Sequence, residues 1–300
     1  MIKILDLNFL GHSKTIASFL LESTAGPILF ETGPASTLPV LEKRLRENGY
    51  EIKDIRHVFI SHVHLDHAGA AWAFARNGSI IYMHPAGERH MTHPEKLYNS
   101  DKRIYQDDMD RLWGELHPVP VQNIWRVPHK EKVRIGQFKI KGWHTPGHAF
   151  HHISWQVNNV LIAGDVAGVK IDDGIVLPPC PPPDINIEQW LDSIRLIRSR
   201  RFDALYLTHF GEVTDVKNHL IELKGRLLNW ATWIKPFFDA GKSAEEIIPL
   251  FQEYVRKQLS AAGIEGESLE RYESANPSWM SVAGLLRYWK KKTEAESSAP

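Results

Sequence analysis

Short apolar runs alternate with amphipathic stretches along the first part of the chain. Each apolar run is followed by glycine or polar residues, which is typical of strands. Leu38, Leu41 and Leu45 recur at the spacing of one helix face, and the small residues at 68–76 indicate a second helix. The predicted strands of this part are residues 3–8, 15–22, 27–31, 57–61 and 79–83. Strands and helices in this order predict layered α and β structure.

The middle of the chain continues this pattern. Residues 101–116 are polar and predict a helix on the outside, and residues 187–199 predict an amphipathic helix. Asn158 and Asn159 suit a tight hairpin turn between two strands. The predicted strands here lie between residues 124 and 163, including 138–143, 153–157 and 160–163, and at 204–207. We therefore expect residues 1–212 to form one α/β unit.

After Glu212 the pattern changes to long helical stretches. The predicted helices are residues 215–240, 244–262 and 278–291, and Gly241 and Gly263 mark the ends of the first two. We expect a helical appendage at 213–292 and a frayed tail at 293–300. The tryptophans and phenylalanines of these helices recur at helical spacing, which favours buried packing. A lid over a site or a dimer contact is the alternative.

The chain is electrically balanced, with 36 Lys and Arg against 36 Asp and Glu. No overall field favours nucleic acid or an anionic membrane, so the expected partner is a small-molecule substrate. The N-terminus lacks the features of a signal peptide, and no run reaches the roughly 18–20 apolar residues of a membrane span. The single Cys180 suits a reducing compartment. These features favour a cytoplasmic protein, and the apolar C-terminal helices are compatible with a homodimer.

Four candidate metal ligands lie within six positions, directly after the predicted strand 57–61. His62 and His64 are two residues apart, so an extended backbone points both side chains to the same side. Asp66 and His67 follow where the chain turns into the next helix, and they can face a second point nearby. Imidazole and carboxylate are good ligands for zinc and similar divalent metals. The run therefore predicts a metal site.

Three further candidate ligands follow other predicted strands. His148 comes after a Pro-Gly turn, Asp165 after the strand 160–163, and His209 after the strand 204–207. Loops at strand ends carry functional side chains on a rigid scaffold. Each of these residues alone would more often be structural, but the cluster at 62–67 makes ligation the favoured interpretation for all three.

These motifs resemble the metallo-β-lactamase superfamily, in its glyoxalase-II-like and lactonase-like branch. The motifs are Ser61-His-Val-His-Leu-Asp-His67, His144-Thr-Pro-Gly-His148, Ala163-Gly-Asp165 and Thr208-His209. The resemblance covers about residues 1 to 212 and implies an αββα sandwich, in which two mixed β-sheets are flanked by helices. It also implies that His62, His64 and His148 hold a first metal, that Asp66, His67 and His209 hold a second, and that Asp165 bridges both.

The resemblance further implies two divalent metal ions, with zinc as the first expectation and iron or manganese as alternatives. Two such ions bind one water between them and lower its pKa, and the resulting hydroxide attacks a carbonyl or phosphorus centre. Asp66 is in addition the candidate catalytic residue, which accepts a proton or orients the nucleophile. The expected activity is hydrolysis of a carbonyl ester, thioester or lactone.

Several alternatives remain open at this stage. A mononuclear iron oxygenase acting on a sulfur substrate would use mainly His62, His64 and His148, and a phosphodiesterase would use the complete ligand set. A metal-binding relic without turnover is a third alternative. Two positions depart from related proteins: Glu31 stands in place of the aspartate of an Asp-Thr-Gly turn, and Gly168 occupies a position where acyl-homoserine lactonases often carry tyrosine.

Three residues near these motifs are candidates for substrate contact. His151 and His152 directly follow the turn that carries His148. Pro178 belongs to the rigid run 177–183, which is locked near extended geometry and follows Asp165 closely. This run either walls the pocket or serves as a stiff connector. Cys180 within it is expected to be inert.

Overall fold

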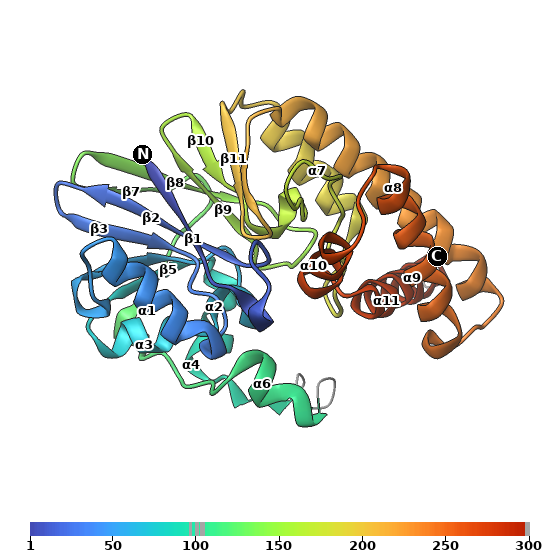
Figure 1. Cartoon of the computed structure of the whole chain (residues 1–300), viewed down its shortest axis with the longest axis horizontal. Coiled ribbons are helices and arrows are strands. Elements are labelled where there is room, and N and C mark those ends of the chain that lie inside the picture. Colours follow the sequence, from blue (N-terminus) through green and yellow to red (C-terminus); the bar gives the residue numbers. More distant parts are fainter. Residues whose placement is uncertain (96–97, 100–101, 103–105, 298–300) are drawn as a thin grey trace.

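Two six-stranded sheets lie face to face in the computed structural model, which describes residues 1–95, 98–99, 102 and 106–297 (Figure 1). The first sheet is antiparallel across its first three strands and parallel across the rest. Its strands, in spatial order, are β1 (Ile2–Asp6), β2 (Ala17–Ser23), β3 (Gly26–Phe30), β4 (His57–Phe59), β5 (Ile80–Met83) and β6 (Ile124–Arg126).

The second sheet is antiparallel except between β10 and β11, which are parallel. Its strands, in spatial order, are β12 (Gly211–Val213), β11 (Ala204–Leu207), β10 (Val160–Ile162), β9 (Ile153–Val157), β8 (Phe138–His144) and β7 (Lys132–Ile135). The predicted turn at Asn158 and Asn159 joins β9 to β10, and Asn158 has a φ of 50°. A left-handed backbone of this kind is typical of such two-residue turns.

Three apolar clusters hold the layers together. Phe19, Phe59 and Trp155 belong to the cluster between the two sheets. The outer face of the first sheet is buried under α1 (Leu38–Glu47) and α3 (Ala71–Arg76), and that of the second under α7 (Ile187–Arg198) and α8 (Val216–Asp239). Figure 1 shows these two pairs of helices on opposite sides of the sheets. The predicted αββα sandwich is confirmed.

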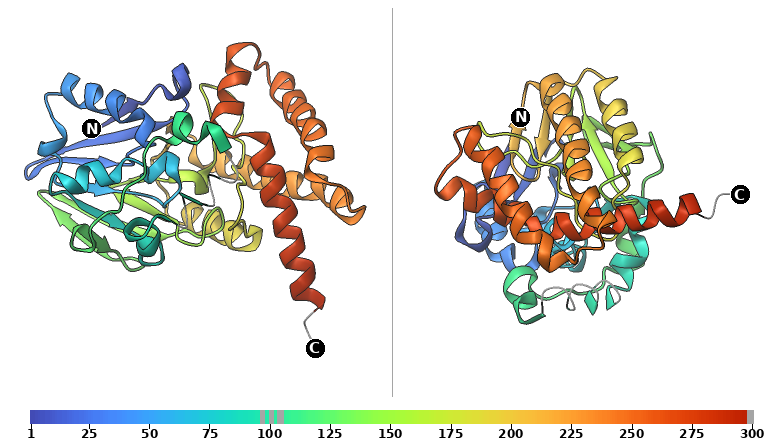
Figure 2. Two further views of the ribbon diagram at one scale, coloured as in Figure 1. Left: turned by 90° about the horizontal axis from the view of Figure 1, so that it is seen from below. Right: turned by 90° about the vertical axis from the view of Figure 1, so that its right-hand side faces the viewer.

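The C-terminal helices extend the cluster that covers the second sheet. The remaining helices are α2 (Leu65–Ala68), α4 (Glu88–Thr92), α6 (Met109–Trp113), α9 (Ala244–Ala261), α10 (Glu267–Ala275) and α11 (Ser278–Ser297). Trp230 is fully buried, and its ring centroid lies 4.9 Å from that of Phe251. The aromatic residues of α8 and α9 therefore pack against one another. Figure 2 shows α11 projecting from the body of the molecule toward the C-terminus.

Several predicted elements differ in extent from the structure. The helix predicted at 68–76 is two helices, because the Ala70 N–H bonds to the Gly33 carbonyl outside the helix. Helix α11 continues to Ser297, so residues 293–297 are helical where a frayed tail was predicted, and 298–300 lie outside the described residues. Within the predicted helix 101–116, residues 101 and 103–105 lie outside the described residues, and α6 covers only Met109–Trp113. The division at residue 212 stays a prediction. None of the described helices is long and apolar enough to cross a membrane.

Candidate metal centre

The candidate ligands all follow the C-terminal ends of strands. Strand β4 leads into the run 62–67, β8 into the turn before His148, β10 into the single turn 164–167 that carries Asp165, and β11 into His209. At the turn before His148, Gly147 has a φ of 135°, and a Cβ there would lie 2.3 Å from the Trp190 backbone. Only glycine fits this position, because α7 packs directly against the turn. The turn is thereby fixed in place.

One group consists of His62, His64 and His148. The Nε2 atom of His62 lies 2.8 Å from Nδ1 of His64, and Nε2 of His148 lies 3.2 Å and 3.1 Å from these two atoms. Three ring nitrogens therefore converge on one point from two separate loops. We call these residues the three-histidine group.

A second group consists of Asp66, His67, Asp165 and His209, and we call it the mixed group. The Nε2 atom of His67 lies 3.2 Å from Oδ1 of Asp165 and 3.5 Å from Oδ2 of Asp66. The Nε2 atom of His209 lies 3.2 Å from the same Asp66 oxygen. Two imidazoles and two carboxylates therefore face one another.

Asp165 connects the two groups. Its Oδ1 faces the mixed group, while its Oδ2 lies 3.4 Å from Nε2 of His148 in the three-histidine group. The side chain is only 5% exposed. A single buried carboxylate therefore presents one oxygen to each group.

Several of the facing atoms lack a hydrogen-bond partner. Nε2 of His67, Oδ1 of Asp165 and Nε2 of His209 are buried and make no hydrogen bond. Buried polar atoms in native structures are almost always paired, so unpaired ones that converge require an explanation. Divalent cations take imidazole nitrogen and carboxylate oxygen as ligands. The residues therefore fit a metal centre.

The ring nitrogens that face away from the site are held by other parts of the chain. Nδ1 of His148 donates to the Pro179 carbonyl at 2.9 Å, and Nδ1 of His209 donates to the Thr15 carbonyl at 2.7 Å. Such contacts fix the tautomer and orientation of a ligand. The sequence analysis did not identify either carbonyl, because no side chain marks them.

Glu31, directly after the neighbouring strand β3, holds the run 61–67. One of its carboxylate oxygens lies 3.0 Å from Nδ1 of His67, and the other accepts the Ser61 N–H at 2.9 Å. Glu31 is fully buried and has a φ of 59°. The glutamate that replaces the family aspartate therefore still supports a predicted ligand.

Burial and local charge shift the pKa values of the two groups in different ways. Burial lowers the pKa of His64 to about 4 and holds the pKa of His62 well below its ordinary value. In the mixed group burial opposes charge, but His67 and His209 hold the pKa of Asp165 below its ordinary value. Asp165 and Asp66 in turn hold the pKa of His67 well above its ordinary value despite its burial. A divalent cation can replace the protons that balance these carboxylates.

Comparison with known proteins agrees with this geometry. The family model of the metallo-beta-lactamase superfamily matches residues 15–209, a range that contains all seven candidate ligands. This chain belongs to that superfamily. The family expected from the motifs is thereby confirmed. Membership of this superfamily, together with the two groups of His and Asp side chains, supports enzymatic function and divalent metal binding.

Two curated relatives and one solved structure are similar to this chain. A metallo-beta-lactamase fold-containing protein of Sulfurisphaera tokodaii is 26% identical over 174 residues, which span 56% of this chain and 66% of that relative, slightly under two thirds. A probable metallo-hydrolase of Methanocaldococcus jannaschii is 28% identical over 216 residues, 71% of this chain and 94% of that protein. A metallo-beta-lactamase family protein of Thermus thermophilus has a TM-score of 0.71 at 19% identity, covering 97% of this chain and 94% of that one. The shared fold therefore includes the C-terminal helices.

The candidate substrate residues differ in their position relative to the candidate metal ligands. The His151 ring lies 5.9 Å from that of His64, and its Nδ1 is buried without a partner. His152 is fully buried, and its two ring nitrogens face the Thr145 hydroxyl at 2.8 Å and the Val166 N–H at 3.4 Å. Pro178 is buried, and its carbonyl accepts from Asn276 at 3.4 Å. We therefore retain only His151 as a proposed substrate contact.

The proline-rich run contacts the metal centre through Pro179 and is supported from behind by α11. A Cβ added to Gly284 would lie 2.0 Å from the Cys180 carbonyl oxygen, so α11 packs against the backbone of the run. We expect Gly284→Ala to displace the Pro179 carbonyl from His148 and to weaken metal binding by about 10- to 100-fold, as loss of an outer support does elsewhere. Titration of the apo-protein with Zn²⁺ measures this change.

Gly225→Ala in α8 is the matched control, because a Cβ there meets no atom within 4 Å. We expect this variant to bind Zn²⁺ like the wild type and to melt at the same or a higher temperature. Equal zinc affinity in both variants would show that α11 does not position His148.

His219 gives a pH-dependent contribution to stability. Its Nε2 donates to the Ala167 carbonyl at 2.7 Å, two residues after Asp165, and burial lowers its pKa to about 4. An unfolded histidine has a pKa of about 6.5, so the unfolded chain binds the extra proton between pH 6.5 and 4. The stabilisation is complete above pH 6.5 and is lost as the pH falls toward 4. We expect this residue to account for about 3 kcal/mol of that loss.

Urea unfolding of the wild type and His219→Gln at pH 7 and pH 4.5 measures the effect. The variant is expected to lose less stability on acidification than the wild type. His93→Gln, at an exposed position, is expected to behave like the wild type. Parallel losses in all three proteins would contradict the assignment to His219.

Proposed function

We propose that the chain is a metal-dependent hydrolase that cleaves a carbonyl ester, thioester or lactone. The observation that carries this proposal is Asp165, whose buried carboxylate faces the three-histidine group with one oxygen and the mixed group with the other. The name of the Methanocaldococcus relative, a probable metallo-hydrolase, supports the same reaction type.

Two divalent cations, zinc in the first place, would supply an activated water nucleophile and polarise the oxygen of the electrophile. The three-histidine group would hold one cation, Asp66, His67 and His209 would hold the other, and Asp165 would bridge them. The completeness of the mixed group favours two cations and hydrolysis over an oxygenase with a single iron.

Asp66 is the proposed catalytic residue. Its side chain is 22% exposed, against 5% for Asp165, so it faces the solvent side of the mixed group. The neighbouring His67 and His209 hold its pKa well below its ordinary value, although burial acts in the opposite direction. An ionised carboxylate at this position can accept a proton or orient the nucleophile.

A panel of lactones, thioesters, aryl esters and phosphodiesters, tested with metal-reconstituted protein, addresses the proposal. We expect turnover of at least one carbonyl substrate, dependent on metal. Turnover of phosphodiesters alone would indicate a phosphodiesterase instead. Oxygen consumption by protein that holds one iron would indicate an oxygenase instead.

His151 is expected to contact the substrate beside the three-histidine group. Its side chain is only 3% exposed, so the proposal requires the ring to turn toward the site, where its unpaired Nδ1 can hydrogen bond with a polar group of the substrate. Its Nε2 lies 3.9 Å from Asp184. We expect His151→Ala to raise KM about tenfold, which corresponds to one lost hydrogen bond. Steady-state kinetics together with metal analysis measures the effect, with exposed His93→Ala as control.

Metal content of the His151→Ala protein is expected to equal that of the wild type. A variant that loses metal while KM stays constant would show instead that His151 supports a ligand.

A further inference from the structure

Strands β7 and β8 present a face of cationic side chains on the outside of the second sheet. Val133, Ile135 and Ile140 point inward to the cluster between the sheets. Their alternate neighbours point outward. The outward residues form what we call the β7–β8 cationic face, together with Arg200 from the loop after α7: Lys132, Arg134, Lys139, Lys141 and Arg200.

Like charges lie directly opposite each other on this face. Lys132 is paired with Lys141 and Arg134 with Lys139 in the antiparallel register. Ile135 and Phe138 flank a two-residue turn and form a hydrogen-bonded pair, so the two cationic pairs occupy non-hydrogen-bonded positions. Side chains are closest at such positions, and like charges there destabilise a sheet. The arrangement therefore costs stability.

Two cations of this face, Lys141 and Arg200, lie over the ring of Trp143. The Lys141 Nζ lies 3.8 Å from the centroid of the indole ring, and the Arg200 guanidinium carbon lies 4.6 Å from it. Partial burial and the nearby Lys132 and Arg200 lower the pKa of Lys141. The indole ring thus contacts two like charges, since its π system attracts cations.

No carboxylate of the described residues forms a salt bridge with any of the five cations. The chain as a whole is neutral, so these five leave 31 cationic side chains against 36 acidic ones on the rest of the molecule. The chain is thus neutral overall but has one strongly positive face.

This face adjoins a free sheet edge. Strand β7 is the last strand of its sheet, and Lys132 and Arg134 are both exposed. At non-hydrogen-bonded positions the N–H and C=O groups of the two residues point away from β8, toward the open edge. Lysine on such an edge normally repels other strands. An acidic strand is the exception, because its charges are attracted.

We infer that the edge of β7 binds an extended acidic segment of a partner protein as an added strand, with alternate carboxylates facing Lys132 and Arg134. Strand addition satisfies the free backbone donors and acceptors, and alternate side chains give specificity. Nucleic acid or an anionic bilayer would neutralise the same charges, but phosphate groups offer no donor to the free carbonyls. This inference is independent of the proposed function of the metal centre.

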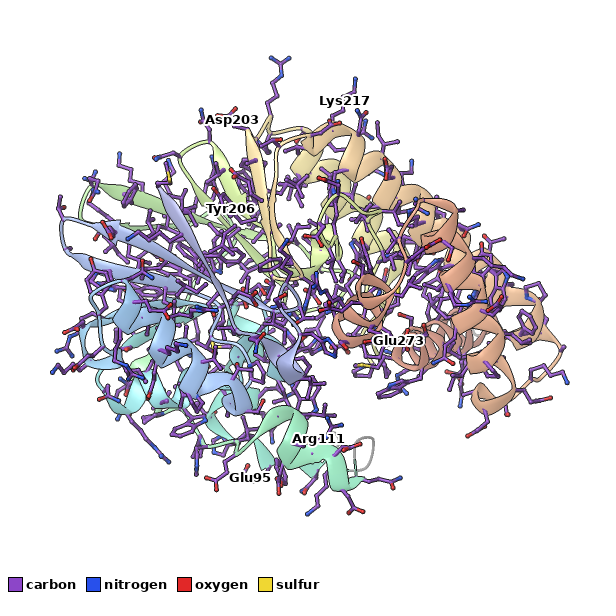
Figure 3. The ribbon with its side chains drawn as sticks, in the orientation of Figure 1. Glu95, Arg111, Asp203, Tyr206, Lys217 and Glu273 are labelled. Atoms are coloured by element: carbon purple, nitrogen blue, oxygen red, sulfur yellow. The ribbon has the colours of Figure 1, made fainter. Side chains whose placement is uncertain are left out.

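The test uses a labelled peptide of about eight residues with alternating glutamate and valine, a typical strand length. We expect it to bind the wild-type protein at low salt and to bind Lys132→Glu/Arg134→Glu about tenfold more weakly or worse. The matched control is Lys217→Glu/Lys224→Glu, which makes the same double charge reversal at two exposed positions of α8 (Lys217 is labelled in Figure 3) and should leave binding unchanged.

Two further probes separate an added strand from simple charge attraction. The same peptide with N-methylated amides keeps its charge but cannot pair with β7, and we expect it to bind at least about tenfold more weakly. An oligothymidylate or phosphatidylserine vesicles that bind more tightly than the peptide would overturn the inference. Equal binding of the methylated peptide, or no peptide binding at all, would overturn it as well.

Thermal melting checks that the double variant is folded. Because the substitutions place glutamates opposite Lys141 and Lys139, we expect a melting temperature at or above that of the wild type. Lys132→Gln, which removes one charge without reversing it, provides a second variant with an intermediate loss of peptide binding.

Discussion

Asp165→Ala is expected to abolish hydrolysis and to reduce the zinc content of the purified protein. Asp165 supplies the one carboxylate that faces both groups of ligands. Its removal takes a ligand from each cation, so we expect kcat/KM to fall by at least about a thousandfold, equivalent to roughly 4 kcal/mol of transition-state stabilisation. Inductively coupled plasma mass spectrometry and steady-state kinetics measure the two changes.

The matched control is Asp203→Ala, which removes an exposed carboxylate at the start of β11 (Figure 3). This variant is expected to retain wild-type zinc and activity. Wild-type activity of Asp165→Ala would remove the basis of the proposed function.

Removal of metal is expected to lower the melting temperature by about 10 °C. Without a cation, three ring nitrogens of the three-histidine group lie within 3.2 Å of one another, and three buried atoms of the mixed group have no partner. Metal at about a thousand times its Kd stabilises a folded protein by about 4 kcal/mol. For a chain of this size each kcal/mol shifts the melting temperature by about 2–4 °C.

Differential scanning calorimetry with a chelator, and again after addition of Zn²⁺, measures this shift. The Asp165→Ala variant is expected to show a smaller response than the wild type. Identical melting of chelated and zinc-loaded wild type would mean that the ligand cluster binds no metal.

The local sequence was sufficient to predict that these seven side chains meet at one site, because each lies at a strand end marked by a short apolar run. That they bind metal stays a prediction. His62 and His64 are only two residues apart in the sequence, and their ring nitrogens also lie close together in the site. The supports of these ligands were not predictable in the same way. The carbonyls of Thr15 and Pro179 reach His209 and His148 from distant parts of the chain. Every residue has a backbone carbonyl, so the residue type does not show which carbonyl will hold a ligand.

The layered fold was predictable from the order of its elements, whereas short elements were not. Strand β12 has three residues, too few for a period to be recognised. Helix α10 is mostly polar, and only Tyr272 and Ala275 of it are buried. Its place in the molecule is set by tertiary contact, since the Tyr272 hydroxyl donates to the Ile175 carbonyl at 2.7 Å. Such contacts arise only in the folded chain.

The most direct test of the metal centre is its binding stoichiometry. Equilibrium dialysis of the apo-protein against Zn²⁺, followed by crystallographic location of the ions from anomalous scattering, should show two ions for each chain. We expect one between His62, His64 and His148, one between Asp66, His67 and His209, and Asp165 between them. No bound ion, or ions held only by other residues, would contradict the account.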